Sequence, residues 1–226
     1  MTWSERHPIR KDSKSISPLA VFTAIIVASQ VVPIAGVTYV KTGVSGMNLD
    51  WTGIPIVIIF DGLGIVYSFV SVIVMWMTIG YRNFTGAIFK TSAETFMLLG
   101  MVAGKLLMGR QTTDRITKLA VCLLAGCSFR AFGMFFTNAA LLPLFYPYTP
   151  QAAYAISTLI VPWNIVQAII NIAGGFALLN LIPSKLAAEA GLGEGADARS
   201  TGLLELSSEE SSEKGLREPT SDPKKE

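Results

Sequence analysis

Residues 51–79 read WTGIPIVIIFDGLGIVYSFVSVIVMWMTI, and this stretch decides between two organisations of the chain. It is longer than the roughly 20 apolar residues that a membrane-spanning helix needs. However, Asp61 lies near its middle and is followed by Gly62-Leu63-Gly64. A lone Asp at the centre of a bilayer costs about 2.5–3.5 kcal/mol on insertion scales, and the two glycines favour a turn. The stretch is therefore either one long helix with a buried carboxylate or two short helices joined by a tight turn.

The composition of the 226-residue chain indicates an integral membrane protein. Apolar residues make up 51% and charged residues only 15% of it, and the mean hydropathy is +0.49. A soluble domain carries about 25% charged residues. Residues 184–226 contain 10 of the 16 acidic residues, whereas the segment from Leu19 to Ile182 contains four. A surface in contact with water could not be built from that segment.

The distribution of Lys and Arg favours six membrane-spanning helices. Apolar runs lie at about 19–40, 52–79, 92–109, 117–146 and 151–182. Cytoplasmic flanks collect basic residues. If the second run forms two helices, eight basic residues lie on the inner side and three on the outer side, whereas one helix there gives six against five. The eight inner residues are Arg6, Arg10, Lys11, Lys14, Arg110, Arg115, Lys118 and Lys185, and the three outer ones are Lys41, Arg82 and Lys90.

The predicted fold is an all-α integral membrane protein, a six-transmembrane-helix bundle in the plasma membrane with both termini in the cytoplasm. We expect residues 1–17 to form a cytoplasmic N-terminal arm and residues 18–182 the membrane domain. Residues 183–226 are rich in Ser, Glu, Gly, Lys and Pro and poor in aromatic residues, which is typical of a disordered tail.

The composition also argues against several classes of function. A net charge of +2 gives no basic field for nucleic acid. The single histidine, His7, lies outside the apolar runs, so histidine-based catalysis or metal binding inside the membrane is excluded. Cys122 and Cys127 lie in an apolar run, where small packing residues are the better interpretation than a metal or redox pair. We therefore expect a protein that is not an enzyme and has no cofactor or metal.

Three alanines mark one face of the first expected helix. Ala20, Ala24 and Ala28 recur every four residues, which places their methyl groups on the same side. Small side chains let another helix approach closely. This face either packs inside the same bundle or contacts a partner protein.

Several polar residues stand out on the last two expected helices. Arg130 and Asn138 lie eight residues apart and should both face the bundle interior or a cavity. Trp163 is followed by two amide side chains, Asn164 and Gln167. An indole beside converging amides suits a neutral polar ligand with a ring system, and hydrogen bonding between helices is the alternative.

From Pro18 to Ile182, the order of these features resembles the substrate-binding S components of energy-coupling factor (ECF) vitamin transporters, which have six helices and an alanine-every-four motif on the first. In the riboflavin-specific subgroup the last helix opens with Pro-Phe-Asn-Leu-Ile-Lys, where this chain has Pro-Trp-Asn-Ile-Val-Gln at 162–167. The other matching positions are Asp50, Ile54-Pro55 and Gly64, then Ala93-Glu94 with Gly100 and Gly104, and Arg130 with Asn138, Pro143 and Tyr146.

The resemblance implies a subunit that captures a vitamin from outside and joins a transmembrane coupling subunit carrying two ATPases. It implies that the alanine face contacts the coupling subunit, that Asn138, Asn164 and Gln167 line the pocket with Trp163 nearby, and that the 41–50 loop with Gly43, Gly46 and Asn48 acts as a lid. Riboflavin is the leading ligand, carried and not used as a cofactor. Gln167 replaces the subgroup's Lys and Trp163 its Phe, so another vitamin or a nucleobase-like compound stays open. Rival interpretations are a membrane-embedded enzyme and a ligand-free interaction protein.

Overall fold

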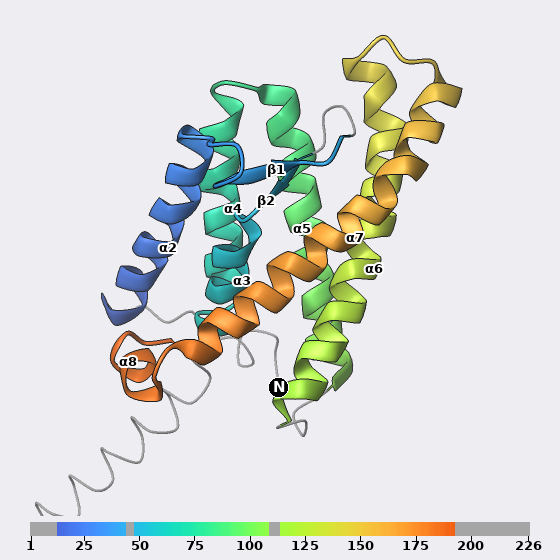
Figure 1. Ribbon diagram of the computed structural model, residues 1–226. Coiled ribbons are helices and arrows are strands. Elements are labelled where there is room, and N and C mark those ends of the chain that lie inside the picture. The colour runs from blue at the N-terminus through green and yellow to red at the C-terminus, as the bar shows by residue number, and fades with distance from the viewer. Residues whose placement is uncertain (1–12, 44–47, 109–113, 193–226) are drawn as a thin grey trace, which may run out of the picture.

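The computed structural model describes residues 13–43, 48–108 and 114–192, which form a helical bundle with a small hairpin (Figure 1). The helices are α2 (Ser13–Val31), α3 (Gly53–Gly62), α4 (Ile65–Gly80), α5 (Phe84–Met108), α6 (Arg115–Phe145), α7 (Pro150–Leu181) and α8 (Ser184–Glu189), and the strands are β1 (Tyr39–Lys41) and β2 (Asn48–Asp50). The predicted all-helical bundle is confirmed at this level. Two of these helices, α6 and α7, are long and apolar enough to cross a membrane, judged by length and composition.

Residues 51–79 form two helices and not one. α3 ends at Gly62 and α4 begins at Ile65, with Gly64 between them at φ +105°. That backbone conformation is one that only glycine adopts readily. Asp61 therefore lies beside a turn, where its Oδ1 is 2.9 Å from Nζ of Lys105 on α5. The break expected from Asp61 and its glycines is present.

A hairpin that the sequence analysis did not predict follows the first helix. The apolar run was expected to continue to residue 40, but α2 ends at Val31. Pro33 has no N–H to donate and disfavours helical conformation in the preceding residue. Beyond it, β1 and β2 pair as antiparallel strands, with Tyr39 opposite Asp50 and Lys41 opposite Asn48.

The expected lid residues lie in or beside this hairpin. Asn48 is the first residue of β2, Gly43 has a φ of +79°, and Gly46 falls outside the described residues. The hairpin lies above α3 and below the upper ends of α4 and α5 (Figure 1).

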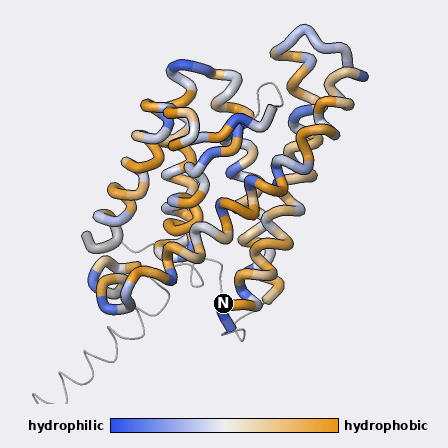
Figure 2. The backbone as a smooth tube through the Cα atoms, viewed as in Figure 1, coloured by the Kyte–Doolittle hydropathy of each residue, from blue (hydrophilic) through white to orange (hydrophobic). Residues whose placement is uncertain are grey.

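Hydrophobic residues predominate along the helices of the bundle (Figure 2). Its core joins buried side chains of α2, α3, α5 and α7, among them Ile26, Ile56, Met97 and Ile172. The α5 and α6 helices approach closely at Gly100, where a Cβ would meet the backbone of Ala125. Large apolar side chains also cover the outer faces. The most exposed on α6 are Ile116, Leu124, Phe132, Phe136 and Leu144.

The α6 helix begins with a polar cap. Asp114 accepts hydrogen bonds from the hydroxyl and the backbone N–H of Thr117 and from the backbone N–H of Ile116. The side-chain hydrogen bond from Thr117, together with the two backbone ones, lowers the pKa of Asp114 below its ordinary value. The cap keeps a negative charge at the positive end of the helix dipole.

The segment after α7 folds back onto the bundle, which corrects the expectation of a disordered tail from residue 183. It forms α8, and Gly191 at φ +73° turns the chain so that the Leu192 N–H donates to the Ala187 carbonyl at 2.7 Å. Leu192 is 6% exposed and packs against Gly62 at the α3–α4 turn. The composition of this segment predicted disorder because a single leucine changes the average polarity of a polar stretch very little. The rest of the expected tail, residues 193–226, lies outside the described residues.

Candidate functional site

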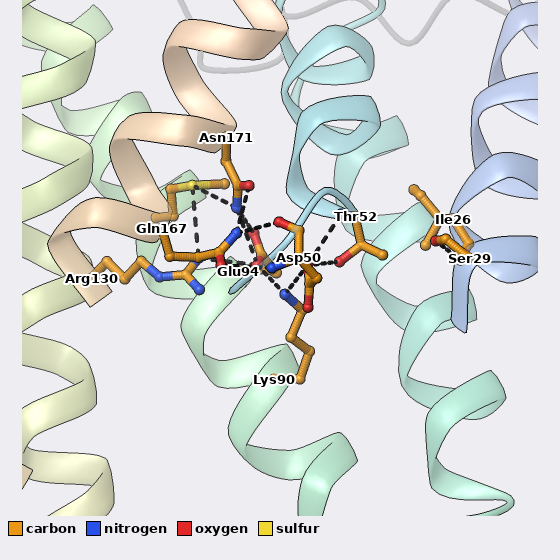
Figure 3. A network of polar contacts seen from close by, with 10 residues as sticks. Ile26, Ser29, Asp50, Thr52, Lys90, Glu94, Arg130, Gln167 and Asn171 are labelled. Atoms are coloured by element: carbon orange, nitrogen blue, oxygen red, sulfur yellow. Dashed lines mark hydrogen bonds and ion pairs between the residues drawn. The ribbon is translucent and has the colours of Figure 1, made fainter. Parts of the chain in front are cut away.

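Four charged side chains form a buried network at the centre of the bundle (Figure 3). Lys90 of α5 places Nζ 2.7 Å from Oδ1 of Asp50 on β2 and 3.0 Å from Oε1 of Glu94, one helical turn further along α5. Nη1 of Arg130 on α6 lies 3.0 Å from the same Glu94 oxygen. Glu94 is 0% and Arg130 2% exposed. Lys90 and Asp50 are partly exposed, at 16% and 14% of their side chains, so two carboxylates and two cations balance each other with the Glu94–Arg130 pair away from solvent.

Two amide side chains of α7 extend the network. Asn171 donates from Nδ2 to both carboxylate oxygens of Glu94, at 3.4 and 3.3 Å. Gln167, one turn earlier, donates from Nε2 to Asn171 Oδ1 at 2.8 Å and to the Asp50 carbonyl at 2.6 Å. Its Oε1 accepts from the Asp50 N–H at 3.0 Å. The network thus ties α7 to the hairpin as well as to α5 and α6.

The Glu94 carboxylate sets the direction of these bonds. An ionised carboxylate can only accept, so Asn171 must turn its NH₂ group towards Glu94 and its carbonyl towards Gln167. Gln167 must then direct its own NH₂ at Asn171, which leaves its carbonyl facing the Asp50 N–H. Hydrogen-bonding chemistry therefore fixes the orientation of both amides.

The start of α3 lies close to α7, and the lack of a side chain at Gly53 leaves room for Asn171. The Asn171 amide occupies the space that a Cβ at Gly53 would fill. Next to Gly53, Thr52 donates to Asp50 Oδ1 from its backbone N–H at 3.1 Å, which fixes the end of β2 to the start of α3. The absence of a side chain at Gly53 is therefore a requirement of the network.

We expect Gly53→Ala to destabilise the protein, because the new methyl group must displace an amide held by Glu94 and Gln167. Overpacking of this kind costs about 1–3 kcal/mol. Gly80→Ala is the matched control, since a Cβ there meets only Ala87 in ordinary contact at 3.7 Å. Thermal unfolding in detergent, followed by tryptophan fluorescence, compares the two. Equal midpoints would show that Asn171 is free to move.

The structure gathers only one of the four predicted pocket residues into this network. Gln167 lies at its centre. Asn164 is buried, but its Nδ2 donates to the Ile160 carbonyl of its own helix at 3.3 Å. Asn138 is buried on α6 and Trp163 is half-buried on α7. Within the described part of the chain, no hydrogen bond joins Asn138, Trp163 or Asn164 to Gln167.

The network also contains residues that were not predicted as site residues. The sequence pointed to Asp50 and Glu94 only as positions of the resemblance, to Arg130 as such a position and as a residue expected to face the interior or a cavity, and to Lys90 only as an outer charge. The signal that could have found them is the pair of four-residue spacings, Lys90 with Glu94 and Gln167 with Asn171, because such pairs share a helix face. Arg130 is buried, as expected.

Chemically, the network is suited to binding. Ionisable groups inside an apolar bundle are costly and typically mark the path or the site of a polar substrate. Among the residues that the structure describes, no three His, Cys, Asp or Glu side chains gather to hold a metal ion. The donors and acceptors present instead form fixed hydrogen-bonding positions. No known protein-family model matches this chain, and no curated protein matches its sequence.

Proposed function

We propose that this chain is the substrate-binding S component of an ECF-type, ATP-driven vitamin importer and that riboflavin is its ligand. The observation that carries the proposal is the charge-balanced polar network buried in an apolar bundle. A bundle that needed only to fold would be as stable, or more so, with apolar side chains there. The cost of burying Glu94 and Arg130 is accounted for if the network binds a polar molecule on its way across the membrane.

The proposal places α2 to α7 across the plasma membrane, with both termini in the cytoplasm. The apolar side chains on the outer faces would then contact lipid. α3 has 10 residues and is about 15 Å long, half of the roughly 30 Å hydrocarbon core. With Gly62 at the inner boundary, Asp50 at the end of β2 and the rest of the network lie near the middle of the bilayer. A ligand could reach that depth from outside where α3 does not fill the outer half.

Labelling of single cysteines tests this topology. In a background in which Cys122 and Cys127 are replaced by Ala, Ile116→Cys at the start of α6 is expected to react with a membrane-impermeant maleimide only after cell lysis. Tyr81→Cys, between α4 and α5, is expected to react in intact cells. Both positions are exposed, so burial does not hide them. Labelling of residue 116 in intact cells would contradict the six-span arrangement.

The exposed alanine face supports the partner part of the proposal. Ala20, Ala24 and Ala28 are all exposed on α2 instead of packed inside this bundle. A face of small side chains flanked by the exposed Val21 and Ile25 suits close contact with a helix of another membrane protein. In the proposed importer that protein is the transmembrane coupling subunit, which carries the two ATPases.

Uptake of labelled vitamin tests the function. Cells without riboflavin uptake of their own are expected to accumulate riboflavin when this chain is expressed with a coupling subunit and two ATPases, and not when the chain is omitted. Membrane-inserted protein that assembles with the partners and gives no uptake of any vitamin would overturn the proposal. That result would favour a ligand-free interaction protein.

A further inference from the structure

Gln167 binds the main chain of Asp50 in an unusual way. Its carboxamide donates to the carbonyl and accepts from the N–H of the same residue, at 2.6 and 3.0 Å (Figure 3). The two residues are 117 positions apart in the sequence. Neither bond uses the Asp50 side chain, which is bound to Lys90 and Thr52. Gln167 therefore recognises an edge made of one acceptor and one donor side by side.

A similar edge occurs on small ring compounds, in which the C=O carbon is bonded directly to the N–H nitrogen, whereas in Asp50 the two groups are joined through Cα. A lactam or a cyclic imide carries a C=O next to an N–H, and a primary carboxamide matches such an edge with two parallel hydrogen bonds. Proteins use Asn and Gln in this way to bind the adjacent donor and acceptor of adenine. The peptide edge of Asp50 is thus an internal equivalent of a lactam edge, and a ligand carrying one could take its place.

The chain holds Gln167 ready for that exchange. Its orientation depends on Asn171 and, through Asn171, on the fully buried Glu94, and neither bond involves the hairpin. If β2 moves away, Gln167 still presents Oε1 to an N–H and one hydrogen of Nε2 to a C=O. Preorganised polar groups lower the entropy cost of binding.

The charges of the network restrict the ligand further. Asp50, Lys90, Glu94 and Arg130 already sum to zero, and Lys90 contacts both carboxylates. A phosphate or carboxylate on the ligand would add a net charge with no partner inside the apolar bundle, which is strongly unfavourable. The network therefore favours a molecule without net charge.

We infer that this site binds an uncharged heterocycle through a lactam or cyclic-imide edge. This edge replaces the N–H and C=O of Asp50 as the hydrogen-bonding partners of the Gln167 carboxamide. The inference rests on the proposed function and deepens it, since it names the part of the ligand that is recognised. The isoalloxazine ring of riboflavin carries such an imide, with the ring N3–H between two carbonyl groups. In the ligand-bound state Gln167 no longer holds β2.

The test compares ligands that differ only at that edge. Riboflavin, N3-methylriboflavin, flavin mononucleotide, lumichrome and uracil are titrated against the purified protein by equilibrium dialysis. Methylation of N3 removes the donor and is expected to weaken riboflavin binding about ten- to hundredfold, because Oε1 of Gln167 is left unpaired. Flavin mononucleotide is expected to bind at least tenfold more weakly than riboflavin.

Two variants assign the effect to Gln167. In Gln167→Met the penalty for N3 methylation is expected to vanish, since both flavins then meet the same apolar side chain. Gln151→Met, the same change at an exposed position of α7, is expected to keep the wild-type penalty. A penalty that persists in Gln167→Met would overturn the inference.

The outcomes separate the inference from the proposed function. Equal binding of riboflavin and N3-methylriboflavin to the wild type would overturn the inference and leave the importer proposal standing. Binding of lumichrome or uracil without riboflavin, abolished by Gln167→Met, would support the inference and remove riboflavin as the ligand. Failure of every imide compound to bind would overturn both.

Discussion

Glu94→Gln is expected to destabilise the bundle by about 3–5 kcal/mol, because removing one partner of a buried ion pair leaves the other charge uncompensated. In this chain Arg130 loses the carboxylate that it contacts, whereas Lys90 loses one of its two carboxylates and keeps Asp50. The unfolding midpoint in detergent should fall by roughly 6–20 °C for a protein of this size. Tryptophan fluorescence during heating measures it.

Two further variants show whether charge is the cause. Asp61→Asn removes the carboxylate of the other Lys–Asp pair, which is partly exposed at the α3–α4 turn, and should cost at most about 1 kcal/mol. Glu94→Gln combined with Arg130→Met removes one charge of each sign and should regain much of the lost stability. If Glu94→Gln were no less stable than Asp61→Asn, the buried network would not contribute as described.

Ala24→Trp is expected to abolish vitamin uptake while leaving ligand binding unchanged. Ala24 is exposed on α2, whereas the network joins β2, α5, α6 and α7. An indole in the middle of the alanine face prevents close approach of a partner helix. Uptake in cells with the complete transporter and riboflavin binding by the purified variant measure the two properties separately.

Ala120→Trp is the control for this prediction, because Ala120 is exposed on α6, on the other side of the bundle from α2 (Figure 1). It should support normal uptake. Normal assembly and transport by Ala24→Trp would show that the alanine face contacts lipid and not a subunit.

The parts of the fold that depend on local sequence could be predicted. Asp61 with Gly64 marked the break between α3 and α4, and unbroken apolar runs marked α6 and α7. The hairpin was missed because residues 31–40 are almost all apolar. They lack the alternation of apolar and polar residues that would have indicated a strand instead of a helix. Pro33 was the one local sign that α2 stops early.

The site could be predicted only in part, because its contacts join distant parts of the chain. Gln167 was identified from its neighbours on α7, but its partner Asp50 is 117 residues away. Asn164 was expected to converge with it, yet its Nδ2 bonds to the backbone of its own helix, which gives the amide donor a partner without help from another helix. Which polar groups meet is decided by how α3 crosses α7 at Gly53, and no local pattern contains that information.

Binding of riboflavin by the purified protein tests the central claim most directly. An absorbance scan after purification in detergent is expected to show a bound flavin, and titration of riboflavin into flavin-free protein should quench the flavin fluorescence until one ligand is bound per chain. Gln167→Met should bind more weakly, and Gln151→Met should bind like the wild type. A colourless protein that gives no quenching at any riboflavin concentration would contradict the account.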